Sequence, residues 1–171
     1  MRAGGFHACS FREIATDVGI KSASVHHHFP AKADLGAALV ARYTARVLAM
    51  FGDPADDRSV PRKLEDMRAI FRSSLVQGDG MCLGGALATE TSSLPPPVAV
   101  ETRQFFAACN DWLYRVFAAA DVPRPEQRAL QVTALLQGAM LQALSFGDIA
   151  AFDGAAEGLA SLLADGRGAS L

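Results

Sequence analysis

The chain has 171 residues, of which half are apolar and a fifth are charged, and its formal net charge is −2. This length fits one hydrophobic core or two small ones, and the composition excludes a disordered or fibrous protein. No apolar run reaches the length of a membrane span and no secretory signal is apparent. We therefore expect a cytoplasmic protein that has no membrane partner.

The charges are unevenly distributed along the chain. Residues 1–50 carry a formal charge of +3 and all four histidines, whereas the remaining residues carry −5. A basic segment attached to an acidic body is typical of a nucleic-acid-binding region joined to a domain with another role.

Two short helical patterns surround one glycine near the N-terminus. Ser10 and Glu13 have the spacing of a capping box, which predicts a helix start at that point. Ile14, Ala15 and Val18 then recur at helical spacing, and Gly19 can adopt the positive φ of a tight turn. Ile20 is expected to return to the core before a second helix begins near Ser22. This order is that of a helix-turn-helix.

The second helix has Val25 and Phe29 as its inward stripe and hydrogen-bonding side chains around the rest. Serine and histidine can both donate and accept, so they suit the base edges and phosphates of a DNA major groove. Pro30 ends the helix. Lys32 follows at the expected start of a long helix, where its ammonium can pair with a DNA phosphate.

These residues together resemble the DNA-binding domain of TetR-family transcriptional regulators. The resemblance rests on Phe6, Ser10 through Ala15, Gly19-Ile20, Ser24-Val25, His27 through Pro30 and Lys32 through Leu35. It implies base or near-base contacts for Ser22, Ala23 and Ser24. It implies phosphate contacts for His26, His27, His28 and Lys32.

The sequence departs from the family pattern in three places. His26 stands where the family usually has tyrosine, and Ala31 stands where a capping residue is common. The family also begins with a helix that packs across the other two, and only the segment Met1 to Phe6 precedes the helix pair here. We expect that Met1 is an internal methionine of a longer natural chain or that the chain has been shortened. Apolar side chains would then lose their cover, namely Ile14, Val18, Val25 and Leu35.

Beyond Lys32 every pattern is helical, which predicts an all-α fold. A stripe of Leu35, Leu39, Tyr43, Val47 and Met50 predicts a connecting helix over about 33–51. Further helices are expected from Val60 to the glycines at 78–80, over 83–94, from Pro97 onwards, over 126–146 and over 149–164. We expect a helix-turn-helix DNA-binding domain over 1–48 and a helical-bundle domain for ligand binding and dimerisation over 49–171.

The second half resembles the C-terminal domain of one TetR subgroup. The matching motifs are Cys82-Leu83, Ala88-Thr89-Glu90, Leu94-Pro95, Phe105-Phe106 and Trp112-Leu113. The last two helices carry small residues among leucines. The resemblance implies that they dock on a second copy as a four-helix bundle, which gives the two-fold symmetry that a helix-turn-helix dimer needs. Packing within one chain only is the alternative.

The resemblance also implies a small-molecule effector held among the middle helices. Residues that mix aromatic, methionine and polar surface are the candidate wall, although each alone also suits an ordinary core. Gln137 is the most informative, because a glutamine in an apolar helix needs a partner: a ligand, water or the second subunit. The candidate wall residues are Met67, Phe71, Phe106, Cys109, Trp112, Gln137 and Met140.

Cysteines and histidines suggest little other chemistry. Cys82 is a candidate sensor of oxidants or electrophiles, with an ordinary small side chain as the alternative. Cys9 and Cys109 have no partner at metal-binding spacing, and adjacent helical histidines point too far apart to share one ion. We expect no metal, no cofactor and no enzymatic activity, since no catalytic motif is present.

The sequence therefore predicts a homodimeric transcriptional regulator that binds double-stranded operator DNA. We expect a repressor that a small-molecule effector releases from the operator. The alternative is a dimeric small-molecule-binding protein whose DNA binding is impaired by the missing first helix.

Overall fold

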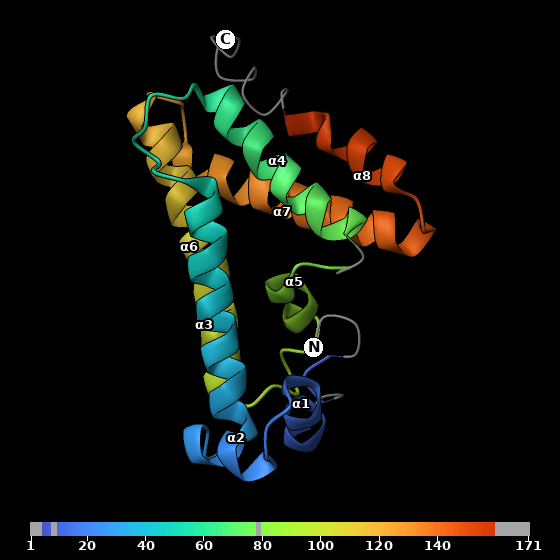
Figure 1. The fold of residues 1–171 in the computed structure, drawn as a ribbon. Helices are drawn as coiled ribbons and strands as arrows, with labels where there is room; N and C mark the ends of the chain where they lie inside the picture. The colour runs from blue at the N-terminus through green and yellow to red at the C-terminus, as the bar shows by residue number, and fades with distance from the viewer. Residues whose placement is uncertain (1–4, 8–9, 78–79, 160–171) are drawn as a thin grey trace.

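The computed structural model describes residues 5–7, 10–77 and 80–159, and within them every regular element is helical. Figure 1 shows a small N-terminal pair of helices at one end and a layer of three helices at the other, joined by two long parallel columns. The all-α prediction is confirmed. The helices are α1 Phe11–Val18, α2 Ser22–His28, α3 Lys32–Phe51, α4 Val60–Val76, α5 Leu83–Ala88, α6 Pro96–Ala119, α7 Pro125–Phe146 and α8 Ile149–Ala156.

The two columns are α3 and α6, which lie side by side along most of their length (Figure 1). At 1.5 Å per residue, the 20 residues of α3 span about 30 Å. On α6 the helical spacing of the sequence predicts an inward stripe, and all of its members are buried: Val98, Thr102, Phe105, Cys109, Trp112 and Val116. The α3 stripe was partly wrong, because Leu39 and Met50 are exposed. The helix instead buries Gly36, Val40, Val47 and Phe51.

Three clusters of buried side chains follow one another along the molecule. The head cluster consists of Phe11, Ala15 and Val25. The body cluster fills the far end, between the second half of α3 and helices α4, α6, α7 and α8. Between them lies the middle cluster, which contains Phe6, Val40, Leu83, Leu87, Leu94, Val98 and Ala99. The two ends are therefore joined by a packed apolar bridge as well as by α3.

Polar contacts hold the far end of α3 in place. The indole Nε1 of Trp112 on α6 donates to the carbonyl of Gly52 at 2.7 Å. Arg58, in the loop after α3, donates to the carbonyl of Phe51 and pairs with Asp56 and Asp66. The end of α3 is consequently tied to both α4 and α6.

The layer at this end is closed by an ion-pair group between α4 and α8. Nε and Nη2 of Arg72 donate to the two carboxylate oxygens of Asp153 at 2.8 and 2.9 Å. Arg68 also approaches Asp153, at 3.3 Å. The paired guanidinium groups, that of Arg72 first, lower the pKa of the Asp153 carboxyl.

Several expected boundaries were wrong. The short helix ends at Ala88 and not at Leu94, because hydroxyls of Thr89, Thr91 and Ser93 donate to carbonyls three residues earlier and favour successive turns. Ile20 does not return to the core but is exposed. Helix α8 ends at Ala156, short of the expected 164, and residues 160–164 lie outside the described residues, as does the expected stop at Gly78-Asp79. The boundary at residue 48 stays a prediction, and α3 runs through it unbroken.

Candidate functional site

The capping box and the glycine turn of the α1–α2 pair are built as the sequence predicted. The Ser10 hydroxyl accepts from the N–H of Glu13, and the Glu13 carboxylate accepts from the backbone and the hydroxyl of Ser10. These hydrogen bonds, that from the Ser10 side chain first, lower the pKa of Glu13. Gly19 has φ +74°, and Ile20 N donates to Ala15 O across the turn, which closes α1 with a glycine in the left-handed region.

Helix α2 is held by one face only. Val25 is buried against Phe11 and Ala15, and the ring of His26 meets that of Phe11 edge-on with centroids 4.6 Å apart. Ser22 is half-buried, whereas the other candidate DNA contacts on the helix, Ala23, Ser24, His26, His27 and His28, are exposed. In Figure 1, α2 lies at the end of the molecule opposite α4, α7 and α8. A polar, exposed helix is thus presented at the tip of the head.

The apolar side chains of the head differ in how far they are buried. Val25 is buried, Ile14 and Leu35 are partly buried, and Val18 is 64% exposed. Of the four residues predicted to lose their cover, Val18 alone is exposed and not buried or partly buried. Leu35 packs against the head cluster from α3.

Lys32 lies at the first position of α3 and already has partners. Its Nζ donates to the carbonyl of His7 at 3.2 Å and sits 4.6 Å from the centre of the Phe6 ring. Ala31 has no side chain that can cap the start of α3. The Asp34 side chain partly replaces such a cap, because its Oδ2 accepts the N–H of Ala31 at 2.9 Å. An ammonium has three donors, so Lys32 keeps capacity for a further acceptor.

The candidate effector residues gather in the body cluster. Met67, Phe71, Cys109, Trp112 and Met140 are all buried in it. Phe106 is partly buried against the same cluster, and Gln137 is half-buried on α7. The seven residues thus come from α4, α6 and α7 to one region of the body.

Gln137 has a partner that the sequence did not indicate. Its Nε2 donates to the sulfur of Cys82 at 3.1 Å, and its Oε1 accepts from the same thiol at 3.4 Å. The N–H of Gly85 also donates to that sulfur, at 3.1 Å. Donation from two N–H groups is stronger when the sulfur is negatively charged. Cys82 is nevertheless only 3% exposed, which restricts access to it.

Cys109 differs from Cys82. It is buried in the body cluster, and burial, with a smaller contribution from Cys82, raises the pKa of its thiol to about 12. At neutral pH this side chain is a protonated part of the core.

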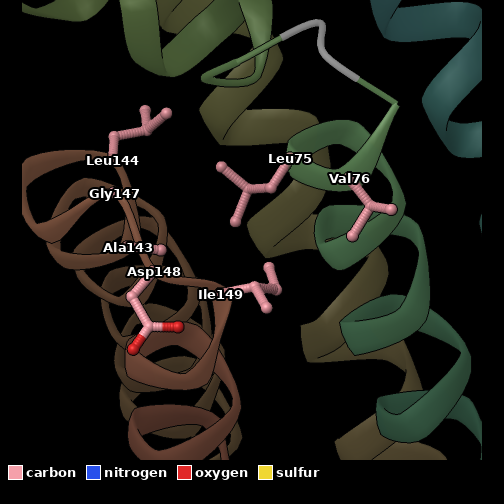
Figure 2. A pocket seen from close by; sticks show the side chains of 7 residues that line it. All are labelled: Leu75, Val76, Ala143, Leu144, Gly147, Asp148 and Ile149. Carbon is pink, nitrogen blue, oxygen red and sulfur yellow. The ribbon is translucent and has the colours of Figure 1, made fainter.

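A surface pocket lies elsewhere, between the end of α4 and the α7–α8 corner. It has a volume of about 470 Å³ and is lined by apolar side chains with one carboxylate, that of Asp148 (Figure 2). None of the residues predicted from the sequence lines it. The lining residues are Leu75, Val76, Ala143, Leu144, Gly147, Asp148 and Ile149.

The outer face of α7 is apolar and uncovered by the chain itself. Leu130, Leu141 and Leu144, which helical spacing places on one side of α7, are 57, 49 and 45% exposed. A Cβ added to Gly138 on α7 or to Gly154 on α8 would meet no atom within 4 Å. Among the described residues, α7 alone is long and apolar enough to cross a membrane, with 39% of its most apolar stretch buried. This face has room for a close neighbour.

Two family models match the chain. "Bacterial regulatory proteins, tetR family" matches residues 1–39, and "Tetracyclin repressor-like, C-terminal domain" matches residues 79–165. A TetR transcriptional regulator from Legionella pneumophila is 30% identical, with a TM-score of 0.85, and the match covers 92% of this chain and 88% of that one. The chain belongs to the TetR family. The helix-turn-helix is therefore its DNA-binding element, and α5 to α8 lie in the part of the chain that the C-terminal model matches.

Two further solved structures are similar to the chain. A transcriptional regulator of the TetR family from Agrobacterium tumefaciens is 28% identical over 95% of this chain and 90% of that one, with a TM-score of 0.85. Escherichia coli NemR in its reduced form is 19% identical over 92% of this chain and 88% of that one, and its TM-score of 0.78 shows the same fold. Among curated proteins, none matches the chain.

Proposed function

We propose that the protein is a homodimeric transcriptional repressor that releases its operator when a small molecule binds the body. One observation carries the DNA-binding half of this proposal: α2 exposes serine and histidine side chains at the tip of a basic head while Val25 fixes its other face. A helix anchored in this way can enter a major groove as a rigid unit.

The residues of the head divide into two roles. Ser22, Ala23 and Ser24 occupy the first turn of α2, the part of a recognition helix that meets base edges. His26, His27, His28 and Lys32 contact phosphates, which sets affinity and orientation but not sequence preference.

The apolar face of α7 supports dimerisation. Three leucines at 45% exposure or more, on one side of a helix that also has an open glycine, form a surface that a second copy can cover by two-fold packing. A homodimer also explains the apolar length of α7 without a membrane. We place the protein in the cytoplasm, in contact with chromosomal DNA.

The effector half rests on the group of residues around Trp112. Buried aromatic and methionine side chains suit a small apolar ligand, and the Gln137 amide at their edge can exchange its bond with Cys82 for one with a ligand. Because Trp112 also holds Gly52 at the end of α3, a ligand that moves Trp112 acts on the helix that carries the head. We assign the protein a regulatory role and no enzymatic one.

Cys82 remains a candidate sensor. Two N–H groups donate to its sulfur, and its burial requires that α5 open before a reagent can enter. Alkylation of a Cys9→Ser variant with N-ethylmaleimide tests this proposal. A sensor requires that modification of Cys82 weaken DNA binding, and unchanged binding after complete modification excludes it.

The test of the main proposal compares two variants on a duplex enriched from a random library. Ser24→Ala should weaken binding to this duplex by about 1–3 kcal/mol and relax the preference for one base pair. Lys32→Ala should weaken binding to all duplexes alike. If the unchanged chain binds no duplex but still dimerises, the alternative of a ligand-binding protein with impaired DNA binding is correct.

A further inference from the structure

The structure connects the C-terminal domain to the head through three residues ahead of the helix-turn-helix, Gly5, Phe6 and His7. Oε2 of Glu90, in the turn between α5 and α6, accepts the backbone N–H of Phe6 at 3.2 Å. In the same turn, the carbonyl of Ser93 lies 3.2 Å from Nε2 of His7, a hydrogen bond when that nitrogen carries the proton. Two contacts from one turn therefore hold the segment 5–7.

The fit around this segment is close. Gly5 has φ +74°, and a Cβ there would overlap the Glu90 carboxylate. Phe6 is 3% exposed within the middle cluster, and a Cβ on Gly36 of α3 would come within 2.7 Å of its ring. Small residues are thus required where the segment meets the turn and where it meets α3.

The other side of the segment holds Lys32. The carbonyl of His7 accepts from Nζ of Lys32, and the ring of Phe6 lies beneath the same ammonium. A lysine side chain otherwise loses rotamer freedom when it is fixed. Holding Lys32 before DNA arrives removes part of this cost from the binding step.

We propose that Glu90 is a positioning residue for DNA binding, which acts by fixing segment 5–7 and through it the ammonium of Lys32. The proposal rests on the proposed function, in which Lys32 contacts a phosphate. It also gives the turn between α5 and α6 a direct mechanical link to the DNA contact, separate from α3. Since Cys82 caps α5, a displacement of that helix would reach Lys32 by the same route.

Charge alone predicts the opposite result, which makes the proposal testable. Removing the Glu90 carboxylate makes the chain less negative, so an electrostatic effect without positioning would strengthen DNA binding. If Glu90 positions segment 5–7, its removal weakens DNA binding instead. Glu90→Ala removes the acceptor for Phe6, whereas Glu90→Gln removes the charge but keeps an oxygen that can accept the N–H.

The experiment measures the affinity of the dimer for its enriched duplex by fluorescence anisotropy between 50 and 200 mM salt. Each phosphate contact contributes about 0.9 to the slope of log K against log salt concentration, so Lys32→Ala should reduce the slope by about 1.8 per dimer. Glu90→Ala should reduce it by at least half as much, and Glu90→Gln should restore most of it. In the Lys32→Ala background, Glu90→Ala should reduce it no further.

Glu157→Ala serves as the charge-matched control, because this exposed carboxylate on the far end of the chain has no role in the proposal. The proposal is overturned if Glu90→Ala leaves the slope unchanged or strengthens binding as the control does, even when it lowers thermal stability. Persistence of its effect in the Lys32→Ala background would also overturn it. Absence of any duplex binding by the unchanged chain would instead refute the proposed function.

Discussion

Leu141→Ala should weaken the homodimer without weakening the fold of each subunit. Leu141 is 49% exposed in the single chain, and full burial of a leucine is worth about 1.5–3 kcal/mol, so about 1 kcal/mol remains to be gained at an interface. Two-fold symmetry places this side chain in the interface twice. The dimer should therefore lose about 1–2 kcal/mol, which is roughly a 5- to 30-fold rise in its dissociation constant.

Sedimentation velocity over a dilution series measures this constant directly. Leu39→Ala is the matched control, because Leu39 is a leucine of similar exposure, 40%, that lies on α3. The control should leave the dissociation constant unchanged. Equal effects of the two substitutions, or no effect of Leu141→Ala, would show that the outer face of α7 is not the interface.

Three further predictions concern the body of the protein. Trp112→Phe keeps an aromatic ring but removes the donor to the Gly52 carbonyl, so it should cost about 1–3 kcal/mol of stability. An unchanged urea midpoint would contradict this. Cys109, with a thiol pKa of about 12, should react with iodoacetamide at pH 8 roughly 10³-fold more slowly than a free cysteine, as followed by mass spectrometry, and comparable rates would contradict its burial. The pKa of Asp56 is lowered to about 2, chiefly by its hydrogen bond with Arg58. Because the folded value lies below the unfolded one, the carboxylate stabilises the fold above about pH 4, and this contribution is lost as pH falls towards 2. Asp56→Asn should accordingly lower the urea midpoint at pH 6 and have little effect near pH 2, and a difference that persists at pH 2 would contradict the assignment.

The head was predictable because its signals are local. The Ser10–Glu13 cap and the Gly19 turn involve residues within a few positions of one another, and the chemistry of each residue type nearly determines the geometry. The exposed character of α2 followed in the same way from the spacing of Val25 among polar residues. Ile20 was placed wrongly because its burial depends on what packs over the turn.

For the body, the sequence predicted the helices but not which of their side chains contact one another. The α6 stripe was correct because helical spacing alone identifies the side of a helix that faces a large core. On α3, apolar residues occupy more than one side, so spacing could not decide between Leu39 and Val40. Neighbouring α6 decides it, which is a property of tertiary packing.

The contacts that matter most for the proposals are the least visible in the sequence. Cys82 and Gln137 are 55 positions apart, and Phe6 and Glu90 are 84 apart. No periodicity relates such pairs. The one signal in the sequence for these contacts was that Gln137, in an apolar helix, needs a polar partner. That signal did not indicate which residue the partner would be.

The most direct measurement is selection of DNA from a random duplex library by the intact protein, followed by sequencing of the enriched pool. A homodimeric helix-turn-helix regulator should enrich one two-fold symmetric sequence, whose half-sites are separated by about 10 base pairs or a multiple of this spacing. Its binding should weaken steeply as salt rises. A pool without enrichment, or one enriched in a single asymmetric site, would contradict the account.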